Sequence, residues 1–312
     1  MLFLPECFGF MGSSAKETLE NAEIIEATTT ATTTLDSNMS HNNDTPLYQR
    51  HNDPAVHDIL VSVVNSMHEI NETAAPSIPN SANQNDDIVY YDNGSISLMD
   101  GLRTIAQASN LWISGGGIHE YVDGQERVYN THVILNDKGD LVCKYRKIHL
   151  FDVSIPDRGI DLQESKTTKA GDSLVVCDSP LGILGLTTCY DMRFPEQYTA
   201  LAQRHGAQIM LMPSAFTVPT GQAHWHVLLR ARAIETQCYV LAAAQVGRHN
   251  EKRESYGHAL AVDPWGVVLA DAGDATSSTN TVIVCDIDLE YLADVRLRMP
   301  IQSHREASHM TP

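Results

Sequence analysis

Residues 182–196 read GILGLTTCYDMRFPE, and this segment restricts the fold more than any other part of the chain. An apolar run typical of a buried strand leads to Cys189, and apolar residues at helical spacing follow Arg193. A strand that turns sharply into a helix lifts the side chain at the turn above the end of a sheet. The first N–H groups of the helix then point towards whatever that side chain attacks. Cys189 is therefore a candidate nucleophile at an acyl carbon, and an ordinary buried cysteine is the alternative.

The acidic composition limits the classes of partner. The chain has 312 residues and a net charge of −18, with an isoelectric point near 5.0. Such a surface repels nucleic acids and anionic membranes. No apolar run reaches the roughly 18 residues that a membrane-spanning helix needs. We therefore expect no nucleic-acid partner and no membrane association.

The cysteine pattern indicates a reducing environment. None of the six cysteines is spaced from another as in a metal site or a redox motif. In a chain of this length, such cysteines are typical of reduced thiols in a cytoplasmic protein. We expect no metal ion and no cofactor.

Residues 27–93 differ in character from the rest of the chain. This segment is rich in Thr, Asn and Ser, and residues 23–92 hold eleven acidic residues against one basic residue. Low hydrophobicity combined with high net charge predicts disorder. We therefore interpret residues 1–312 as a single domain that is interrupted by an acidic insertion at about 27–93.

The order of the remaining elements predicts an α/β fold with two mixed sheets packed face to face and helices outside. Strands are expected at 2–4, 111–115, 128–135, 141–145, 174–177, 182–188, 209–212, 239–244, 256–262, 267–270 and 282–287. Helices are expected at 98–106, 224–237 and 289–297, and a long polar loop follows residue 150. Because residues 2–4 read as a core strand at the very start, we expect the usual first strand and helix of such a domain to be lacking.

Three chemically capable side chains stand at the ends of predicted strands: Glu6, Lys147 and Cys189. A buried carboxylate can accept the thiol proton, while a nearby lysine lowers the pKa of the thiol and stabilises the negative charge of a tetrahedral intermediate. A cysteine–histidine pair is the alternative, with four candidates in the ordered regions. These are His149, His224, His226 and His258, and no spacing selects one of them.

The segments around these residues resemble the carbon–nitrogen hydrolases of the nitrilase superfamily. The matching segments are LPECFGFMG, YRKIHLFD, CYDMRFPE, HWHVLLRARAIETQCYVLAAAQVGRH, YGHALAVDPWG and MPIQSHR, and together they extend over nearly the whole chain outside 27–93. The resemblance implies an αββα sandwich and a catalytic set of Glu6, Lys147 and Cys189. It also implies a second glutamate that supports the lysine, matched by Glu164, for which a solvated loop carboxylate is the alternative. The backbone N–H of Tyr190 and Lys147 would form the oxyanion hole.

Within the superfamily, the chain looks most like the Nit branch, whose members hydrolyse deaminated glutathione through a cysteine thioester. An amide substrate that bears carboxylates requires a cationic anchor, and Arg193 is the candidate, with a structural ion pair as its alternative. There are two competing hypotheses. The chain could be an ω-amidase of the sister branch, or it could be an interaction protein whose site is impaired because the start is truncated. Position 226 is commonly glutamate in the family and is His226 here. The resemblance further implies a homodimer.

Overall fold

Two mixed β-sheets form the centre of the molecule. The computed structural model describes residues 1–6, 97–155, 160–251, 253–276 and 282–307, so the predicted insertion at 27–93 lies outside the described residues. The four-stranded sheet has the order β1 (Leu2–Phe3), β2 (Ile113–Glu120), β3 (Tyr129–Leu135) and β4 (Leu141–Arg146). The six-stranded sheet has the order β14 (Val268–Asp271), β13 (Leu260–Val262), β10 (Tyr239–Ala242), β9 (Ile209–Leu211), β8 (Gly182–Leu186) and β7 (Val175–Ser179).

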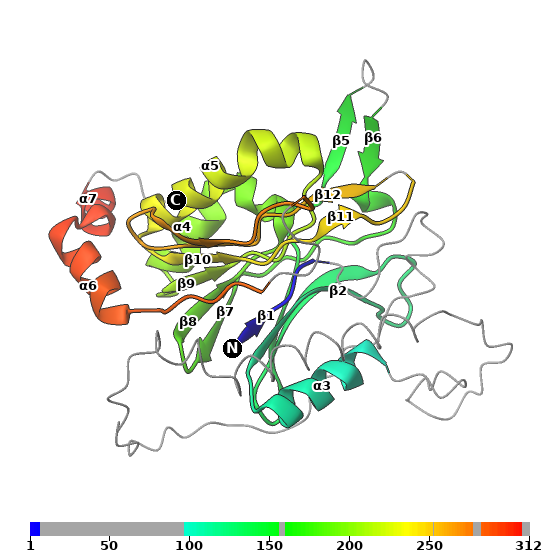
Figure 1. The fold of residues 1–312 in the computed structure, drawn as a ribbon, viewed down its shortest axis with the longest axis horizontal. Coiled ribbons are helices and arrows are strands. Elements are labelled where there is room, and N and C mark those ends of the chain that lie inside the picture. Colours follow the sequence, from blue (N-terminus) through cyan, green and yellow to red (C-terminus); the bar gives the residue numbers. More distant parts are fainter. Residues whose placement is uncertain (7–96, 156–159, 252, 277–281, 308–312) are drawn as a thin grey trace, which may run out of the picture.

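Helices cover the outer face of each sheet (Figure 1). Helix α3 (Leu98–Ser109) packs on the four-stranded sheet through Leu102 and Ile105, and α4 (Pro195–Gln203) and α5 (Val218–Thr236) pack on the six-stranded sheet. A third apolar core joins side chains of the two sheets, among them Ile134 of β3 and Leu184 of β8. Helices α6 (Leu289–Arg298) and α7 (Ile301–Ala307) follow at the C-terminal side. The predicted αββα sandwich is confirmed.

The parallel centre of the six-stranded sheet positions the candidate nucleophile. Strands β8, β9 and β10 are parallel neighbours, and antiparallel strands flank them on both sides. The carboxyl ends of neighbouring parallel strands meet at one edge, which is where open α/β sheets bind ligands. Cys189 follows β8 at this edge and begins the short 3₁₀ helix η4 (Cys189–Arg193).

A glycine in β2 allows the segment that carries Glu6 to approach the sheet. The prediction ended this strand at the glycines, but β2 continues through them. Gly116 has φ of +59°, and a Cβ atom there would lie only 2.0 Å from the carbonyl oxygen of Pro5. Only glycine combines this backbone conformation with such a close contact. Strand β1 pairs with β2 in parallel and forms one edge of the described four-stranded sheet.

Three further segments differ from their predicted structure. The expected strand at 256–262 is divided into β12 (Glu254–Tyr256) and β13, because Gly257 and His258 both have positive φ. The expected polar loop after residue 150 contains a hairpin of β5 (Asp152–Ile155) and β6 (Ile160–Gln163), followed by the 3₁₀ helix η3 (Glu164–Lys166). The segment 282–287 has the alternating exposure of a strand, with Cys285 and Ile287 packed on the core between the sheets, but it joins neither sheet. Strand β11 (Val246–Arg248) pairs with β12 instead of extending a sheet.

Candidate active site

Cys189 is held on a strained backbone. Its φ is +49°, a value that non-glycine residues adopt only where the surroundings impose it. The backbone N–H of Cys189 donates to the carbonyl of Pro213 (2.9 Å), which lies just beyond β9. The turn between β8 and η4 is therefore fixed to the neighbouring parallel strand, and the half-buried thiol stays at the sheet edge.

Glu6 and Lys147 form a buried ion pair beside this thiol. The two side chains come from the ends of β1 and β4, and Lys147 Nζ lies 3.0 Å from Glu6 Oε1. Both are nearly inaccessible to solvent, with 2% of the Lys147 side chain and 6% of the Glu6 side chain exposed. The Cys189 thiol lies close enough to the Glu6 carboxylate that each group shifts the pKa of the other. The structure thus brings the three predicted groups together.

Glu164 supplies a second carboxylate to the same ammonium group. Lys147 Nζ lies 3.0 Å from Glu164 Oε1 and 2.9 Å from Oε2, and the backbone N–H of Phe151 donates to Oε2 (2.7 Å). The Glu164 side chain is 19% exposed, so it closes the outer side of the cluster. Its contact with Lys147 favours the predicted supporting role over a solvated loop carboxylate. Two carboxylates share one ammonium group, which leaves the cluster with a net negative charge.

Burial and charge set the resting protonation states of the site. Burial tends to raise the pKa of Glu6, but the charge of Lys147 and hydrogen bonds from Cys189, Lys147 and Asn130 outweigh it, so the pKa is lowered. Burial also opposes the charge of Lys147, yet Glu164 and Glu6 raise the pKa of its ammonium group well above the ordinary value. The resting site therefore holds a Glu6 carboxylate and a protonated Lys147.

Lys147 lowers the pKa of the thiol as predicted, but two larger effects oppose it. The sequence led us to expect that the lysine lowers the pKa of Cys189. In the structure, burial and the negative charge of Glu6 raise this pKa well above the ordinary value, and the opposing effect of Lys147 is smaller. Cys189 therefore rests as a thiol and needs a base in contact with it, and Glu6 is in that position.

Tyr190 and Arg193 lie on the two ends of η4. Tyr190 is in its first turn, where the N–H groups have no acceptor within the helix, and its ring contacts Phe151 edge-on at 5.0 Å between centroids. The guanidinium of Arg193 lies 5.7 Å from the centroid of the Tyr190 ring and 5.6 Å from that of Phe216. Within the described residues, no carboxylate forms an ion pair with Arg193. Its cationic group thus remains available for an anionic ligand.

Comparisons with known proteins agree with this fold and this cluster. A family model described as carbon-nitrogen hydrolase matches residues 72–297. A deaminated glutathione amidase of Dictyostelium discoideum is 48% identical over 72% of this chain and 76% of its own length. The human deaminated glutathione amidase is 50% identical over 67% of this chain, but over only 63% of its own length. This chain belongs to the carbon–nitrogen hydrolase family.

A solved structure from the same family has a similar fold. The crystal structure of the Caenorhabditis elegans NitFhit protein superposes with a TM-score of 0.60 at 43% identity, over 68% of this chain and 50% of that one. Among the described residues of this carbon–nitrogen hydrolase, no helix is long and apolar enough to cross a membrane.

One buried aspartate, which sequence reasoning missed, joins the segments that carry Lys147 and Cys189 in this carbon–nitrogen hydrolase. Asp191 accepts hydrogen bonds from the backbone N–H of Thr188 (2.9 Å) and the hydroxyl of Tyr145 (2.7 Å) through Oδ2. Its Oδ1 accepts from the backbone N–H of His149 (3.1 Å) and contacts the ring Nδ1 of that residue (2.8 Å). Asp191 thereby ties the residues around Lys147 to the turn at Cys189. Its place two residues after the cysteine is the only signal in the sequence.

Asn130 and His119 were also missed, because both lie inside strands and not at their ends. Asn130 Nδ2 donates to Glu6 Oε1 (2.8 Å) and to Glu164 Oε1 (3.4 Å). His119 on β2 interacts electrostatically with Glu6, Glu164 and Lys147, and burial is the main reason that its pKa is lowered. A neutral imidazole near the cluster adds no second positive charge.

The four histidines considered as partners of Cys189 bond elsewhere in the described structure. His149 pairs with Asp191 and stacks on Phe194, while His224 contacts Arg193 at 3.3 Å. His226 and His258 both contact Asp271. The geometry therefore favours the glutamate base over the cysteine–histidine alternative.

Proposed function

We propose that this chain is an amidase that hydrolyses deaminated glutathione to 2-oxoglutarate and cysteinylglycine through a thioester on Cys189. The observation that carries the proposal is the buried Glu6–Lys147 ion pair beside the Cys189 thiol. A thiol, a carboxylate base and a fixed positive charge are the groups that acyl transfer from an amide requires. The relatives named deaminated glutathione amidase, at 48% and 50% identity, support this choice of substrate.

In the acylation step, Cys189 Sγ attacks the amide carbon while Glu6 takes the thiol proton. The π electrons of the carbonyl move to its oxygen, and Lys147 together with the backbone N–H of Tyr190 stabilises the resulting oxyanion. As the carbonyl reforms, the C–N bond breaks and Glu6 gives its proton to the departing amine of cysteinylglycine. A thioester with the 2-oxoglutaryl group remains on Cys189, and Glu6 is again ionised.

In the deacylation step, a water molecule attacks the thioester carbon and gives a proton to Glu6. The same oxyanion groups stabilise the second tetrahedral intermediate. The C–S bond then breaks, the proton on Glu6 returns to sulfur, and 2-oxoglutarate leaves. One carboxylate thus serves as base and acid in alternation, starting from a resting site in which Glu6 is ionised and the thiol carries its proton.

Arg193 is the proposed anchor for a substrate carboxylate. Its guanidinium lies over aromatic rings next to the nucleophile and is not paired with a carboxylate in the described part of the chain. A guanidinium binds carboxylates in a bidentate manner. Lysine in place of Arg193 would retain the positive charge but could not donate two parallel hydrogen bonds to a carboxylate. The replacement should therefore raise KM more than it lowers kcat.

A side-by-side measurement separates the two amidase candidates. The ratio kcat/KM is determined for deaminated glutathione and for a dicarboxylate monoamide, the substrate of an ω-amidase. The proposal predicts a clearly higher kcat/KM for deaminated glutathione. A higher kcat/KM for the monoamide would instead identify the chain as an ω-amidase. Absence of turnover with both substrates, together with a Cys189 thiol that iodoacetamide does not alkylate, would support an impaired interaction protein.

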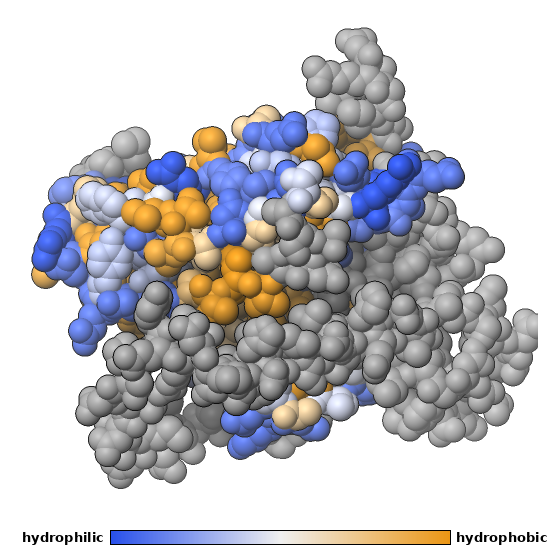
Figure 2. All heavy atoms as spheres, viewed as in Figure 1, coloured by the Kyte–Doolittle hydropathy of each residue, from blue (hydrophilic) through white to orange (hydrophobic). Residues whose placement is uncertain are grey.

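The proposal includes a homodimer in the cytoplasm without nucleic-acid or membrane partners. Apolar side chains remain exposed on α5 and on the adjoining turn before β14, among them Val227 (68%), Ile234 (44%) and Trp265 (53%). Figure 2 shows apolar residues gathered on the face that carries β13 and β14. A second copy would cover such a surface. The five described cysteines are free, as expected of reduced thiols in the cytoplasm.

A further inference from the structure

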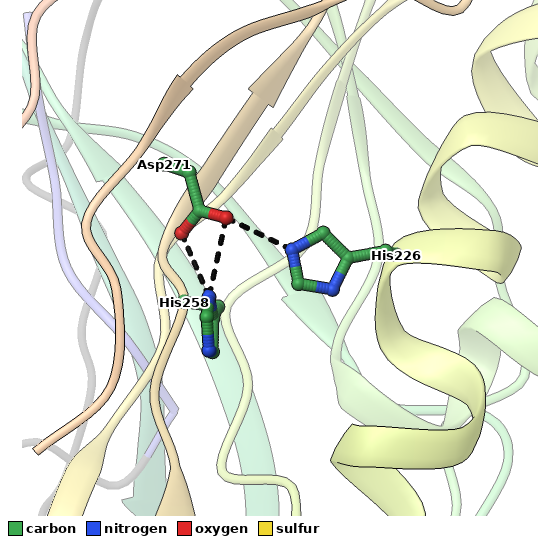
Figure 3. A group of neighbouring side chains, drawn as sticks. All are labelled: His226, His258 and Asp271. Atoms are coloured by element: carbon green, nitrogen blue, oxygen red, sulfur yellow. Dashed lines mark hydrogen bonds and ion pairs between the residues drawn. The ribbon is translucent and has the colours of Figure 1, made fainter.

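Two histidines and an aspartate meet at a place that the amidase chemistry does not use. His226 projects from α5, His258 lies between β12 and β13, and Asp271 ends β14 (Figure 3). The three residues are far apart in sequence, so no spacing motif announces them. Imidazole and carboxylate groups are the ligands that zinc and related divalent cations prefer.

The distances within this cluster are close to those of a coordination site. His226 Nε2 lies 2.9 Å from Asp271 Oδ2, and His258 Nδ1 lies 2.9 Å from Oδ1 and 3.2 Å from Oδ2. The potential ligand atoms all lie within 4.8 Å of one another. A tetrahedral zinc ion with bonds of about 2.0–2.1 Å separates its ligand atoms by about 3.3 Å. An ion would therefore require shifts that side-chain rotation can supply.

Two of the three residues are already fixed in place. The backbone of His258 has φ of +58°, its N–H donates to the carbonyl of Gly273 (2.7 Å), and its carbonyl accepts from the Trp225 indole (2.7 Å). The His258 ring stacks on Tyr256 at 4.5 Å between centroids. Asp271 Oδ1 accepts the backbone N–H of Gly273 (2.8 Å). Ligands that are held before the ion arrives lose less conformational entropy when it binds.

The cluster is open to solvent on one side. The side chains of His226, His258 and Asp271 are 35%, 20% and 31% exposed. A cation can therefore enter directly, and three protein ligands leave a fourth position for water, as in open zinc sites.

We propose that His226, His258 and Asp271 bind one zinc-like divalent cation. The ion takes the place of the hydrogen bonds between the imidazole rings and the carboxylate, and each ring then carries its proton on the other nitrogen. Bound in this way, the ion links α5 to the β13–β14 edge of the six-stranded sheet and stabilises the folded chain by mass action. The position commonly held by glutamate in the family contributes a nitrogen ligand here.

Calorimetric titration tests the site on the full chain, freed of any affinity tag and treated with chelator. Zinc chloride is titrated into the wild type, into His226→Gln and His258→Gln, and into His205→Gln, which alters an exposed histidine elsewhere. We expect one ion per chain in the wild type and in His205→Gln, and at least tenfold weaker binding in the two cluster variants. At a hundredfold excess of zinc over Kd, the wild-type Tm should rise by roughly 5 °C.

Equal affinity in the cluster variants and in His205→Gln would overturn the proposal, as would the absence of binding heat in the wild type. If the cluster variants do not fold, the absorption spectrum of cobalt(II) bound to the wild type tests the proposal without them. The proposal predicts the intense visible absorption of tetrahedral cobalt, displaced by one equivalent of zinc. A weak spectrum like that of cobalt in water would contradict it. Because these readouts are independent of turnover, their failure leaves the proposed amidase untouched.

Discussion

At the residue scale, the site depends on one ammonium group between two carboxylates. Lys147 contacts Glu6 at 3.0 Å and Glu164 at 2.9 Å, and almost none of its side chain is exposed. Removing one member of a buried ionic cluster leaves the others uncompensated in a medium of low polarity. Lys147 therefore supports both the fold and the proposed oxyanion hole.

Replacement of this lysine should damage stability as well as catalysis. In Lys147→Met, Glu6 and Glu164 face each other without a cation, and the free energy of unfolding should fall by about 3–5 kcal/mol. Urea denaturation measures the change. Lys138→Met, at an exposed turn, is the matched control and should unfold like the wild type. Equal stability of Lys147→Met and Lys138→Met would contradict the claim that Lys147 compensates the charges of Glu6 and Glu164 in a buried site.

His132 joins the two sheets in its neutral form. Its Nδ1 lies 3.1 Å from the carbonyl of Thr187 and must donate to it, so Nε2 accepts from the Ser114 hydroxyl (2.7 Å). Burial, the largest effect, lowers the pKa of His132 from 6.5 to about 4. The unfolded chain thus takes up a proton at a higher pH than the folded chain. The stability that His132 contributes is complete above pH 6.5 and is lost as the pH falls to about 4.

This shift predicts an acid-dependent loss of stability. Between about pH 7 and about pH 5, His132 should account for a fall of roughly 2 kcal/mol in the free energy of unfolding. Urea unfolding of the wild type and of His132→Gln at both pH values measures it. The variant should lose less stability over this interval, and an identical loss in both proteins would exclude His132 as the cause.

The sequence predicted the members of the candidate site better than the residues that hold them in place. Glu6, Lys147, Cys189 and Glu164 stand at strand ends or beside them, where local pattern and resemblance identify them. Asn130 is the second residue of β3, and its contacts follow only from the pairing of β3 with β2 and β4, which no local pattern specifies. Local pattern also gives no indication that burial and Glu6 together outweigh the effect of Lys147 on the pKa of the Cys189 thiol.

At the element scale, α5 fits against β12 through a single glycine. A Cβ atom at Gly221 would lie 2.2–2.4 Å from atoms of the Tyr256 side chain. Gly221→Ala should therefore push the helix from the strand and lower the free energy of unfolding by about 1–3 kcal/mol. The loss should be smaller on a Tyr256→Leu background, and denaturation of the four proteins of this double-mutant cycle tests it. Additive effects would show that the helix–strand contact is not the cause.

Element boundaries departed from the prediction where tertiary contacts override local pattern. Helix α5 begins at Val218, before the apolar periodicity starts, because Pro219 favours the first turn of a helix. The segment 282–287 alternates like a strand, but its inward residues pack on the core without a partner strand in either sheet. Alternation predicts which side chains face the core and says nothing about the neighbour that supplies hydrogen bonds.

At the scale of the whole molecule, the proposed dimer should depend on α5. Its apolar residues lie on two faces, with Trp225 and Leu229 buried and Val227 and Ile234 exposed. Val227→Lys would place a charge in the proposed interface and should shift the sedimentation coefficient from that of a dimer to that of a monomer. Leu297→Lys on α6, where the leucine is 79% exposed, is the control and should remain dimeric. A wild type that sediments as a monomer would contradict the proposal.

The layered architecture was predictable as a whole. The number of strands exceeded what one small sheet accommodates, and helical patterns separated the buried strands at the parallel centre. The hairpin of β5 and β6 was not expected, because its strands are only four residues long and the alternation of polar and apolar residues in them is correspondingly short. The meeting of His226, His258 and Asp271 was equally hidden, since it depends on the packing of α5 against β12 and β13.

The central claim is that Cys189 forms the thioester, and turnover of deaminated glutathione by Cys189→Ala tests it most directly. Release of cysteinylglycine is compared for the wild type, Cys189→Ala and Cys285→Ala, the last altering a half-buried cysteine of the core. The account predicts that Cys189→Ala keeps its fold and loses at least about a thousandfold in kcat. It also predicts that Cys285→Ala retains activity. Equal turnover by Cys189→Ala and the wild type would contradict it.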